Sequence, residues 1–320
     1  MEVISLFSGA GGLDLGFIQA GHKIVWANDI DKDAVDTYKK NIGDHIVLKD
    51  LKEISSNEIP NGDIVIGGFP CQGFSVANMT RGTDDERNTL YLEMLRIIKE
   101  KQPKFFLAEN VKGILSLGKG SVIKMIVEDF EKAGYKVKYK LFNLADYGVP
   151  QKRERVIFVG VRNDINFEYD FPLPTHSENP KYDLFNQEKL NKWVSIGEAL
   201  KGLPEPSEES TILNHVCSNY KVIENKNFTG HRMIDPTKPS PTILARGNGK
   251  GGVVVIHHPS NTRRMSVRET AIIQGFPMNH EFIGSKTSCY RQIGNAVPPI
   301  FAKKLANKFN LYLIEGENGK

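Results

Sequence analysis

Apolar and polar positions alternate in a regular order over the first 163 residues of the chain. Runs of about four to eight apolar residues, bounded by turn or charged residues, are typical of strands buried in a sheet. Six runs of this kind predict strands, at residues 3–7, 23–28, 45–48, 63–68, 105–108 and 155–161.

Between these runs the apolar residues recur with helical spacing. In one such stretch, Leu90, Met94 and Ile97 fall on the same helical face. Strand and helix in alternation predict an α/β fold, a doubly wound and mainly parallel sheet with helices on both faces. Ligands of such sheets bind at the carboxyl ends of the strands. The helices are expected at residues 13–20, 33–40, 89–101 and 120–133.

The pattern changes after the last of these strands. Residues 167–187 are rich in Pro, Asn, Asp and Ser, which is typical of a loop or a domain junction. Further along we expect a short helix near 195–200, and two strands at 242–245 and 253–257 joined by a glycine-rich basic loop. A helix follows Pro299. The length of 320 residues fits one large domain and a smaller one.

Composition narrows the class of protein. No apolar run approaches the roughly 18 residues that cross a bilayer, and the amino terminus has no basic and then apolar signal segment. We therefore expect a cytoplasmic protein. Cys71, Cys217 and Cys289 are widely spaced without a C-x-x-C pair, so neither a disulfide framework nor a metal site is expected.

Charge is unevenly distributed along the chain. Residues 1–150 hold 19 basic and 21 acidic side chains, which leaves 23 basic and 17 acidic for the remainder, a net charge of −2 against +6. A local positive surface indicates a polyanionic partner, although charge alone slightly favours a solvated loop region. The basic residues gather between 230 and 268, where one acid, Asp235, accompanies Arg232, Lys238, Arg246, Lys250, Arg263, Arg264 and Arg268.

A glycine-rich turn, "LFSGAGGLDLGF", joins the first expected strand to the first helix. Gly9, Gly11 and Gly12 let the backbone approach a ligand closely, next to a helix amino terminus. Asp29 ends the second strand, at the place for a ribose hydroxyl pair, and Asp50 ends the third. Each acid alone is more simply a helix cap. Together, at successive strand ends, they indicate a nucleoside pocket.

The segment "IGGFPCQGFS" places Cys71 in a constrained loop after the fourth strand. Most lone cysteines pack among apolar neighbours, and we interpret Cys217 and Cys289 in that way. The neighbours of Cys71 are glycine, proline and polar residues, so its thiol is presented on the rim of the sheet. Free N–H groups in such a loop lower a thiol pKa, and the thiolate is a strong nucleophile.

Two further motifs carry charge to the same rim. Glu109 follows four apolar residues, where it is either a strand-end cap or a protonatable group in a partly dry pocket. Arg153 and Arg155, in "PQKRERVIFVG", alternate along an extended segment, so both can point toward one anion or carbonyl. Taken singly, an exposed ion-pair face is the better interpretation of the two arginines.

These motifs, in this order, resemble those of the DNA (cytosine-5)-methyltransferases. The resemblance spans nearly the whole chain, and Pro-Cys-Gln followed by ENV and Q-x-R-x-R is highly specific. Residues 175–260 match least, and in this family that stretch is the variable target-recognition part. The matching segments are "FSGAGG" at 7–12, Asp29, Asp50, "GGFPCQGFS" at 67–75, "ENV" at 109–111, "QKRER" at 151–155, "RRMSVRETAIIQGFP" at 263–277 and "IGNAVPP" at 293–299.

The resemblance implies the domain organisation and the cofactor. Residues 1–171 and 285–320 would form a catalytic domain of the Rossmann-like S-adenosylmethionine-dependent type, and residues 172–284 an inserted target-recognition domain. Asp29 and Ile30 stand where relatives often carry glutamate and an aromatic residue. The expected cofactor-binding residues are Phe7, Gly9, Gly11, Asp29, Ile30, Asp50, Leu51, Pro70, Asn295 and Val297.

The resemblance also implies the reaction. Cys71 would add to carbon-6 of cytosine, so that carbon-5 becomes nucleophilic enough to take a methyl group from S-adenosylmethionine. Glu109 would bond the ring N3 and the exocyclic amine, while Arg153 and Arg155 would hold the carbonyl oxygen and the cysteine loop. The base must leave the duplex for this chemistry. Expected DNA-binding residues are Gln72, Ser75, Arg246, Lys250, Arg263 and Arg264.

The preferred function is that of a monomeric bacterial enzyme modifying a short site in double-stranded DNA, as part of a restriction-modification system. A tRNA cytosine-5 methyltransferase of the same fold and a non-catalytic DNA-binding module remain as alternatives. A nicotinamide oxidoreductase is disfavoured by the glycine spacing and the cysteine loop. A zinc deaminase is rejected, because position 74 is Phe rather than a second cysteine.

Overall fold

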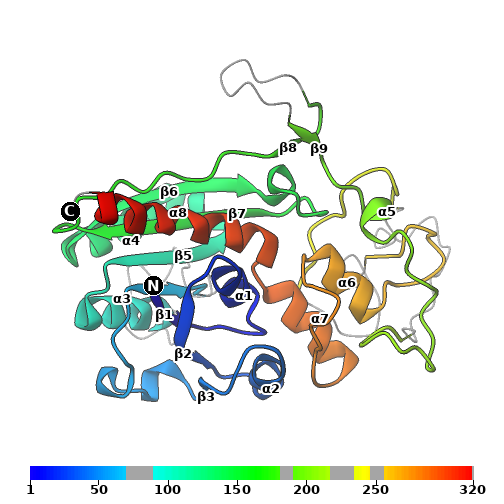
Figure 1. Cartoon of the computed structure of the whole chain (residues 1–320), viewed down its shortest axis with the longest axis horizontal. Helices are drawn as coiled ribbons and strands as arrows, with labels where there is room; N and C mark the ends of the chain where they lie inside the picture. Colours follow the sequence, from blue (N-terminus) through cyan, green and yellow to red (C-terminus); the bar gives the residue numbers. More distant parts are fainter. Residues whose placement is uncertain (70–88, 181–189, 217–233, 246–255, 319–320) are drawn as a thin grey trace.

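A seven-stranded sheet forms the frame of the molecule in the computed structural model, which describes residues 1–69, 89–180, 190–216, 234–245 and 256–318 (Figure 1). The strand order is β3-β2-β1-β4-β5-β7-β6, parallel from β3 to β5, with β7 antiparallel to both of its neighbours. The expected mainly parallel, doubly wound sheet is therefore confirmed. The strands are β1 (Glu2–Leu6), β2 (Lys23–Asp29), β3 (Ile46–Leu48), β4 (Ile64–Gly67), β5 (Phe105–Val111), β6 (Tyr135–Asn143) and β7 (Glu154–Arg162).

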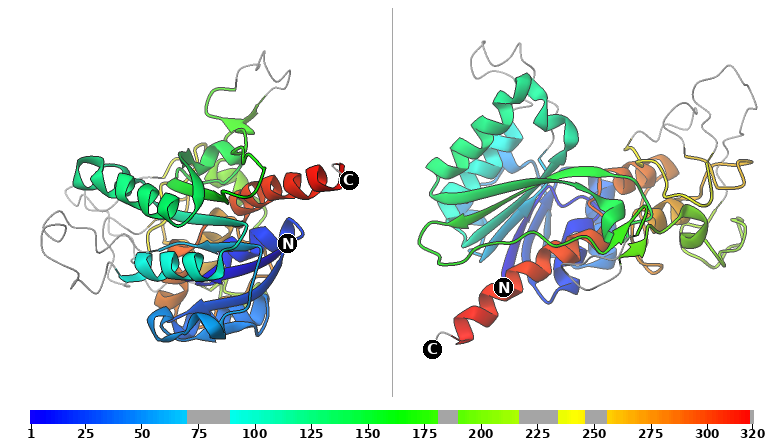
Figure 2. Two further views of the ribbon diagram at one scale, coloured as in Figure 1. Left: turned by 90° about the vertical axis from the view of Figure 1, so that its left-hand side faces the viewer. Right: turned by 90° about the horizontal axis from the view of Figure 1, so that it is seen from above.

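Helices cover both faces of the sheet, because successive residues of a strand point to opposite sides. Ile64 and Ile66 of β4 belong to one buried cluster, and Val65 between them belongs to the other. Seen from above, α4 and α8 lie on opposite sides of the sheet (Figure 2). One cluster includes α1 (Gly12–Gln19), α2 (Lys32–Asn41) and α8 (Pro299–Asn318); the other includes α3 (Thr89–Lys101) and α4 (Ser121–Lys132).

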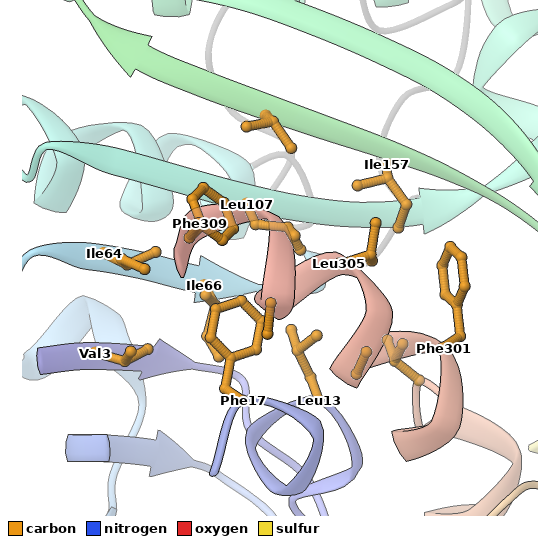
Figure 3. Packing of buried hydrophobic residues seen from close by; sticks show 14 of the residues in the cluster. Val3, Leu13, Phe17, Ile64, Ile66, Leu107, Ile157, Phe301, Leu305 and Phe309 are labelled. Atoms are coloured by element: carbon orange, nitrogen blue, oxygen red, sulfur yellow. The ribbon is translucent and has the colours of Figure 1, made fainter. Parts of the chain in front are cut away.

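The carboxyl-terminal helix packs on the amino-terminal part of the chain. Phe17 of α1 and Phe309 of α8 are fully buried, with ring centroids 6.0 Å apart, and Leu13 and Leu305 lie in the same cluster (Figure 3). Burial of one such side chain contributes about 1.5–3 kcal/mol. This packing brings the segment before α8 to the glycine-rich turn before α1.

A smaller part of the chain lies beside the sheet and contains α5 (Ile196–Ala199), α6 (Val267–Ile273) and α7 (Lys286–Asn295) (Figure 1). Its buried cluster joins Met265 and Phe282 to Tyr290 of α7 and to Ala10 of the glycine turn. The cluster thus extends across residues 284–285, and the predicted domain boundary stays a prediction. The remaining elements are β8 (His176–Ser177), β9 (Asn191–Lys192) and the 3₁₀ helices η1 (Leu51–Glu53), η2 (Ser56–Glu58), η3 (Lys112–Leu115), η4 (Leu117–Gly120) and η5 (Leu144–Tyr147).

Two expectations about strands need correction. β6 was not predicted, because it is an edge strand in which exposed lysines interrupt the apolar pattern. The strand expected at 242–245 is irregular, since its hydrogen bonds go to residues 151–153 instead of a neighbouring strand: the Gln151 side chain accepts from the Ile243 N–H at 2.9 Å. Of the strand expected at 253–257, the first three residues lie outside the described part of the chain, and His257 forms an isolated bridge with Arg264.

Candidate functional site

A cavity of about 540 Å³ opens at the carboxyl ends of β1, β2, β4 and β5. It brings together segments far apart in the chain: the glycine turn, residues 28–31, residues 49–51, residues 109–111, the arginines before and at the start of β7, and residues 291–297. This is the edge at which open parallel sheets bind ligands. Part of the cavity wall is the amino terminus of α1, whose free N–H groups favour negative or polar ligand atoms.

The glycine turn is held by β2. The Gly9 N–H donates to Asp29 Oδ2 at 2.8 Å, and the Asp31 N–H donates to Oδ1 at the same distance. Burial raises the pKa of Asp29 above its usual value, although these two hydrogen bonds oppose the rise. Phe7, at the start of the turn, has the left-handed φ of 55°, a strained conformation for a bulky residue and one often found at functional sites.

Two glycines of the turn are required by close packing. A Cβ atom on Gly11 would collide with the side chain of Ile42 and lie 3.1 Å from Tyr38, and the left-handed φ of 79° also favours glycine there. A Cβ atom on Gly12 would collide with the carbonyl oxygen of Val297. Gly11 packs against Ile42 and Tyr38 and is absent from the cavity lining, so its contact with the cofactor stays a prediction.

The residues that line the cavity fit S-adenosylmethionine by their chemistry. Each oxygen of the Asp29 carboxylate retains a lone pair beyond the N–H it binds, so Asp29 can still accept from ribose hydroxyls. Asp50 caps η1 by accepting from the Lys52 N–H at 3.0 Å, and it also lines the cavity. Pro70 lies outside the described residues. Eight of the expected cofactor residues line the cavity: Phe7, Gly9, Asp29, Ile30, Asp50, Leu51, Asn295 and Val297.

Glu109 and Arg155 form an ion pair in the same cavity. Arg155 Nε lies 2.7 Å from Glu109 Oε1, and each side chain is 12% exposed. In the antiparallel pair of β5 and β7, Arg155 stands opposite Val111, and Ile157 stands opposite Glu109. The two charged residues are therefore diagonal neighbours on one face, within reach of long side chains. A carboxylate held by a guanidinium in this way can present its second oxygen to a ligand.

Arg153 has a different set of partners, which corrects the expectation that both arginines point toward one group. Its guanidinium is buried and donates to the carbonyls of Ile243 at 3.0 Å, Gly294 at 2.9 Å and Ala296 at 3.2 Å. Burial lowers its pKa. Arg153 precedes β7, so the alternation of a strand does not govern it. It ties residues 243 and 294–296 to the start of β7.

The predicted nucleophile, Cys71, lies outside the described residues, as do Gln72, Ser75, Arg246 and Lys250. The chain leads to Cys71 from the wall of the cavity, because Gly68 and Phe69 both line it. Asn110 Nδ2 donates to the Phe69 carbonyl at 2.9 Å and so ties this end of the cysteine segment to β5.

Arg263 and Arg264, two of the expected DNA-binding residues, have partners inside the protein. Arg263 binds Glu269 and Glu205 at 2.8 and 2.7 Å, and these acids raise its pKa against the effect of burial. Arg264 is buried over the ring of Tyr290, 3.6 Å from its centroid. These contacts give no support to phosphate binding by either residue, which stays a prediction.

Sequence reasoning missed three features of the site. Arg291 lines the cavity and binds Asp31 at 2.6 Å. Gln274 joins Gln151 at 2.6 Å and supports the same carbonyl of residue 296 that Arg153 binds. Asp14 lies buried beneath the glycine turn. The one signal in the sequence was an acid inside the apolar run after the glycines, "GLDLGF".

Two features are absent from the part of the chain that the structure describes. It has no helix that combines the length and the apolar character of a membrane span. It also has no group of three or more His, Cys, Asp or Glu side chains arranged to hold a metal ion.

The sequence of the whole chain is similar to those of known proteins. The family model of C-5 cytosine-specific DNA methylases matches residues 1–310. The chain is 41% identical to the Type II methyltransferase M.NgoFVII of Neisseria gonorrhoeae, over 95% of this chain and 85% of that protein. It is 39% identical to the Type II methyltransferase M.FnuDI of Fusobacterium nucleatum, over 100% and 97% of the two chains.

A solved structure agrees with this relationship. A prophage-encoded methyltransferase of E. coli aligns with a TM-score of 0.73 and 26% identity, over 98% of this chain and 99% of that one. The order of motifs, the mainly parallel sheet and the match over almost the full length all agree. The chain therefore belongs to the family of C-5 cytosine-specific DNA methylases.

Proposed function

We propose that the protein transfers a methyl group from S-adenosylmethionine to carbon-5 of a cytosine in a short site of double-stranded DNA. The observation that carries the proposal is the Glu109–Arg155 pair, which lies in the same cavity as the glycine turn and Asp29. In this proposal the Glu109–Arg155 pair binds the base and the glycine turn binds the cofactor nucleoside, both within the same cavity. S-adenosylmethionine supplies an electrophilic methyl group there.

In this proposal Cys71, Glu109 and Arg155 each act on a different atom or group of the cytosine ring. The Cys71 thiolate adds to carbon-6, and the ring electrons move toward carbon-5, which becomes nucleophilic. Glu109 bonds N3 and the exocyclic amine and offsets the charge that develops on the ring. Arg155 orients Glu109 and donates to the carbonyl oxygen. After methylation, loss of the carbon-5 proton breaks the bond to sulfur and releases the base.

Arg153 has a positioning role in this proposal. Two of its three carbonyl contacts, to Gly294 and Ala296, hold residues 294–296 in the cavity wall. The cofactor residues and the start of β7 are thereby kept in a constant relative position. A rigid arrangement of reacting groups contributes to the rate because little reorganisation is needed during the reaction.

The substrate and the biological setting are further parts of the proposal. The target cytosine must leave the stacked duplex, at a cost of a few kcal/mol. Gln72 and Ser75 would contact the extruded nucleotide, and Arg246 and Lys250 would contact the DNA. The named relatives are Type II methyltransferases. We therefore propose a monomeric modification enzyme that acts on DNA in the bacterial cytoplasm and protects it from a matching endonuclease.

A covalent trap tests the function directly. Duplex DNA containing 5-fluorocytosine cannot lose a proton from carbon-5, so the enzyme should stay bound to it in the presence of S-adenosylmethionine. We expect a protein–DNA adduct by mass spectrometry with the native protein and with Cys289→Ser, which alters a buried thiol in α7. Cys71→Ser should give none.

The choice of nucleic acid decides between the alternatives. A pool of duplexes with varied sequence and a pool of tRNA, both containing 5-fluorocytosine, are tested side by side. An adduct with tRNA alone would contradict the DNA assignment. The absence of an adduct with both pools, from a folded protein that binds S-adenosylmethionine, would support a non-catalytic module.

A further inference from the structure

Asp14 is a fully buried acid in the first turn of α1, and it lines the cavity. Its Oδ2 accepts from Ser5 Oγ at 2.9 Å, and its Oδ1 accepts from the Tyr38 hydroxyl at 3.0 Å. Within the described part of the chain, no lysine or arginine forms an ion pair with it. A buried carboxylate without a cation destabilises the folded protein, so its presence in the cavity wall calls for a functional reason.

The neighbours of Asp14 support the glycine turn. Ser8 Oγ, in the turn, donates to Ser5 Oγ at 2.9 Å, and the Tyr38 ring lies beneath Gly11. A neutral side chain such as asparagine could make similar hydrogen bonds. What the aspartate adds to this wall is a negative charge in a place with little water.

The cations of the cavity are held by groups other than Asp14, and Arg153 is bound by three backbone carbonyls. Arg155 is paired with Glu109, and Arg291 is paired with Asp31. Both oxygens of Asp29 accept backbone N–H groups. A cationic ligand in the cavity would therefore be attracted by the Asp14 carboxylate, and Asp29 in the same lining adds to this attraction.

The proposed cofactor and its product differ in charge at one atom. S-adenosylmethionine carries a sulfonium, and the sulfur keeps the bonding electron pair when the methyl group leaves, which makes S-adenosylhomocysteine a neutral thioether. We propose that the Asp14 carboxylate makes the cavity prefer the cationic methyl donor over the neutral product, and so assists product release. This inference rests on the proposed function.

The preference should depend on pH. Burial raises the pKa of Asp14 to about 6, while the hydrogen bonds from Ser5 and Tyr38 lower it and the nearby Asp29 raises it. The ionisable groups that face Asp14 are Tyr38 of α2, Asp29 of β2 and, through the Tyr38 hydroxyl at 3.1 Å, His45. Asp14 is then ionised above about pH 7, where the preference for S-adenosylmethionine should be complete. It is protonated toward pH 5, where the preference should be lost.

Calorimetric titration with each ligand from pH 5 to 8.5 tests the inference. In the native protein, the ratio of the two dissociation constants should change by about three- to tenfold across this range, in favour of the donor at high pH. Near pH 6, binding of the donor should release protons and binding of the product should not, as seen in buffers of different ionisation enthalpy. Asp14→Asn should abolish both effects. Asp36→Asn, at an ion pair on the exposed side of α2, is the control.

A second variant keeps the test decisive. Tyr38→Phe removes a hydrogen bond that lowers the pKa of Asp14, so it should move the midpoint of the pH dependence upward. A native ratio and pH dependence in Asp14→Asn would overturn the inference, and so would an unmoved midpoint in Tyr38→Phe. Equal affinity for both ligands at every pH would refute the inference alone. Failure to bind either ligand would refute the proposed function as well.

Folding of Asp14→Asn is checked by thermal melts. The pKa of Asp14 is raised from 3.8 in the unfolded chain to about 6 in the fold, so the folded state binds more protons between these values and loses stability as the pH rises through them. Asparagine cannot ionise and avoids that loss. The variant should therefore be at least as stable as the native protein above pH 6.

Discussion

Glu109 and Arg155 come from adjacent strands that run in opposite directions, and this arrangement allows their side chains to form an ion pair. The antiparallel register makes them diagonal neighbours, and their small exposure strengthens the attraction between them. The guanidinium fixes the position of the carboxylate before any ligand arrives. Arg153, two positions earlier, is instead held by three backbone carbonyls and acts on the wall of the cavity.

Replacement of Glu109 by glutamine tests this assignment. Glutamine keeps the size of the side chain but cannot be protonated or form an ion pair with Arg155, so methyl transfer in a single turnover should slow by about 10²- to 10⁴-fold. The affinity for S-adenosylmethionine should change little. Glu154→Gln, at an exposed neighbour paired with Lys112, is the matched control and should retain its rate. A native rate in Glu109→Gln would remove Glu109 from the mechanism.

At the scale of elements, the contact between α1 and α8 decides how the two ends of the chain meet. A Cβ atom on Gly16 would collide with the Ala302 side chain and lie 2.6 Å from the Lys303 nitrogen. The two helices therefore approach each other more closely than larger side chains allow (Figure 3). Their position places Val297 at the start of α1, and hence sets one wall of the cavity.

We predict that Gly16→Ala separates these helices and lowers the free energy of unfolding. Overpacking of this kind costs about 1–3 kcal/mol, which exceeds the small gain in helix propensity from alanine. Urea denaturation measures the difference. Gln19→Ala changes an exposed position of the same helix and should leave stability nearly unchanged. A neutral or stabilising effect of Gly16→Ala would show that the two helices pack less closely than described.

At the scale of the whole molecule, α2 connects the sheet to the segment that carries α7. The Thr37 hydroxyl donates to Gln292 at 2.7 Å and accepts from the Ile283 N–H at 2.8 Å. Asn41 exchanges two hydrogen bonds with the backbone of Glu281, at 2.7 and 2.8 Å. Because α2 follows Asp29 and Asp31, this junction holds the nucleoside side of the cavity against the side formed by residues 291–297.

Thr37→Val should weaken the junction without changing the size of the side chain. It leaves the Ile283 N–H and one acceptor of Gln292 without a partner, at a cost of about 1–3 kcal/mol. In the variant, amide hydrogen exchange should become faster than in the native protein for residues 281–292. The exchange rates of β4 and β5 should stay close to their native values. Thr237→Val, at an exposed position, provides the comparison. Equal protection of residues 281–292 in native protein and variant would contradict the role of Thr37.

Much of the large domain was predictable, because its elements are encoded by local patterns. The expected strands at 3–7 and 63–68 correspond to β1 and β4, and the expected helix at 120–133 corresponds to α4. Prediction failed where a segment is defined by distant partners. β6 is a strand because it pairs with β7 at the edge of the sheet, and residues 242–245 are irregular because they bond to Gln151 and Arg153.

The sequence by itself determined the family, the alternating strands and helices of the sheet domain except β6, and the meeting of glycine turn, acids and Glu109 at one edge of the sheet. These follow from periodicity and from short motifs, which act over a few residues. The tertiary structure alone decided which side chains are partners: Arg155 with Glu109, Arg153 with the wall at 294–296, and Arg264 with Tyr290. Partnership depends on register and packing between distant segments, so a buried acid such as Asp14 reveals its setting only when β1, α1 and α2 are assembled.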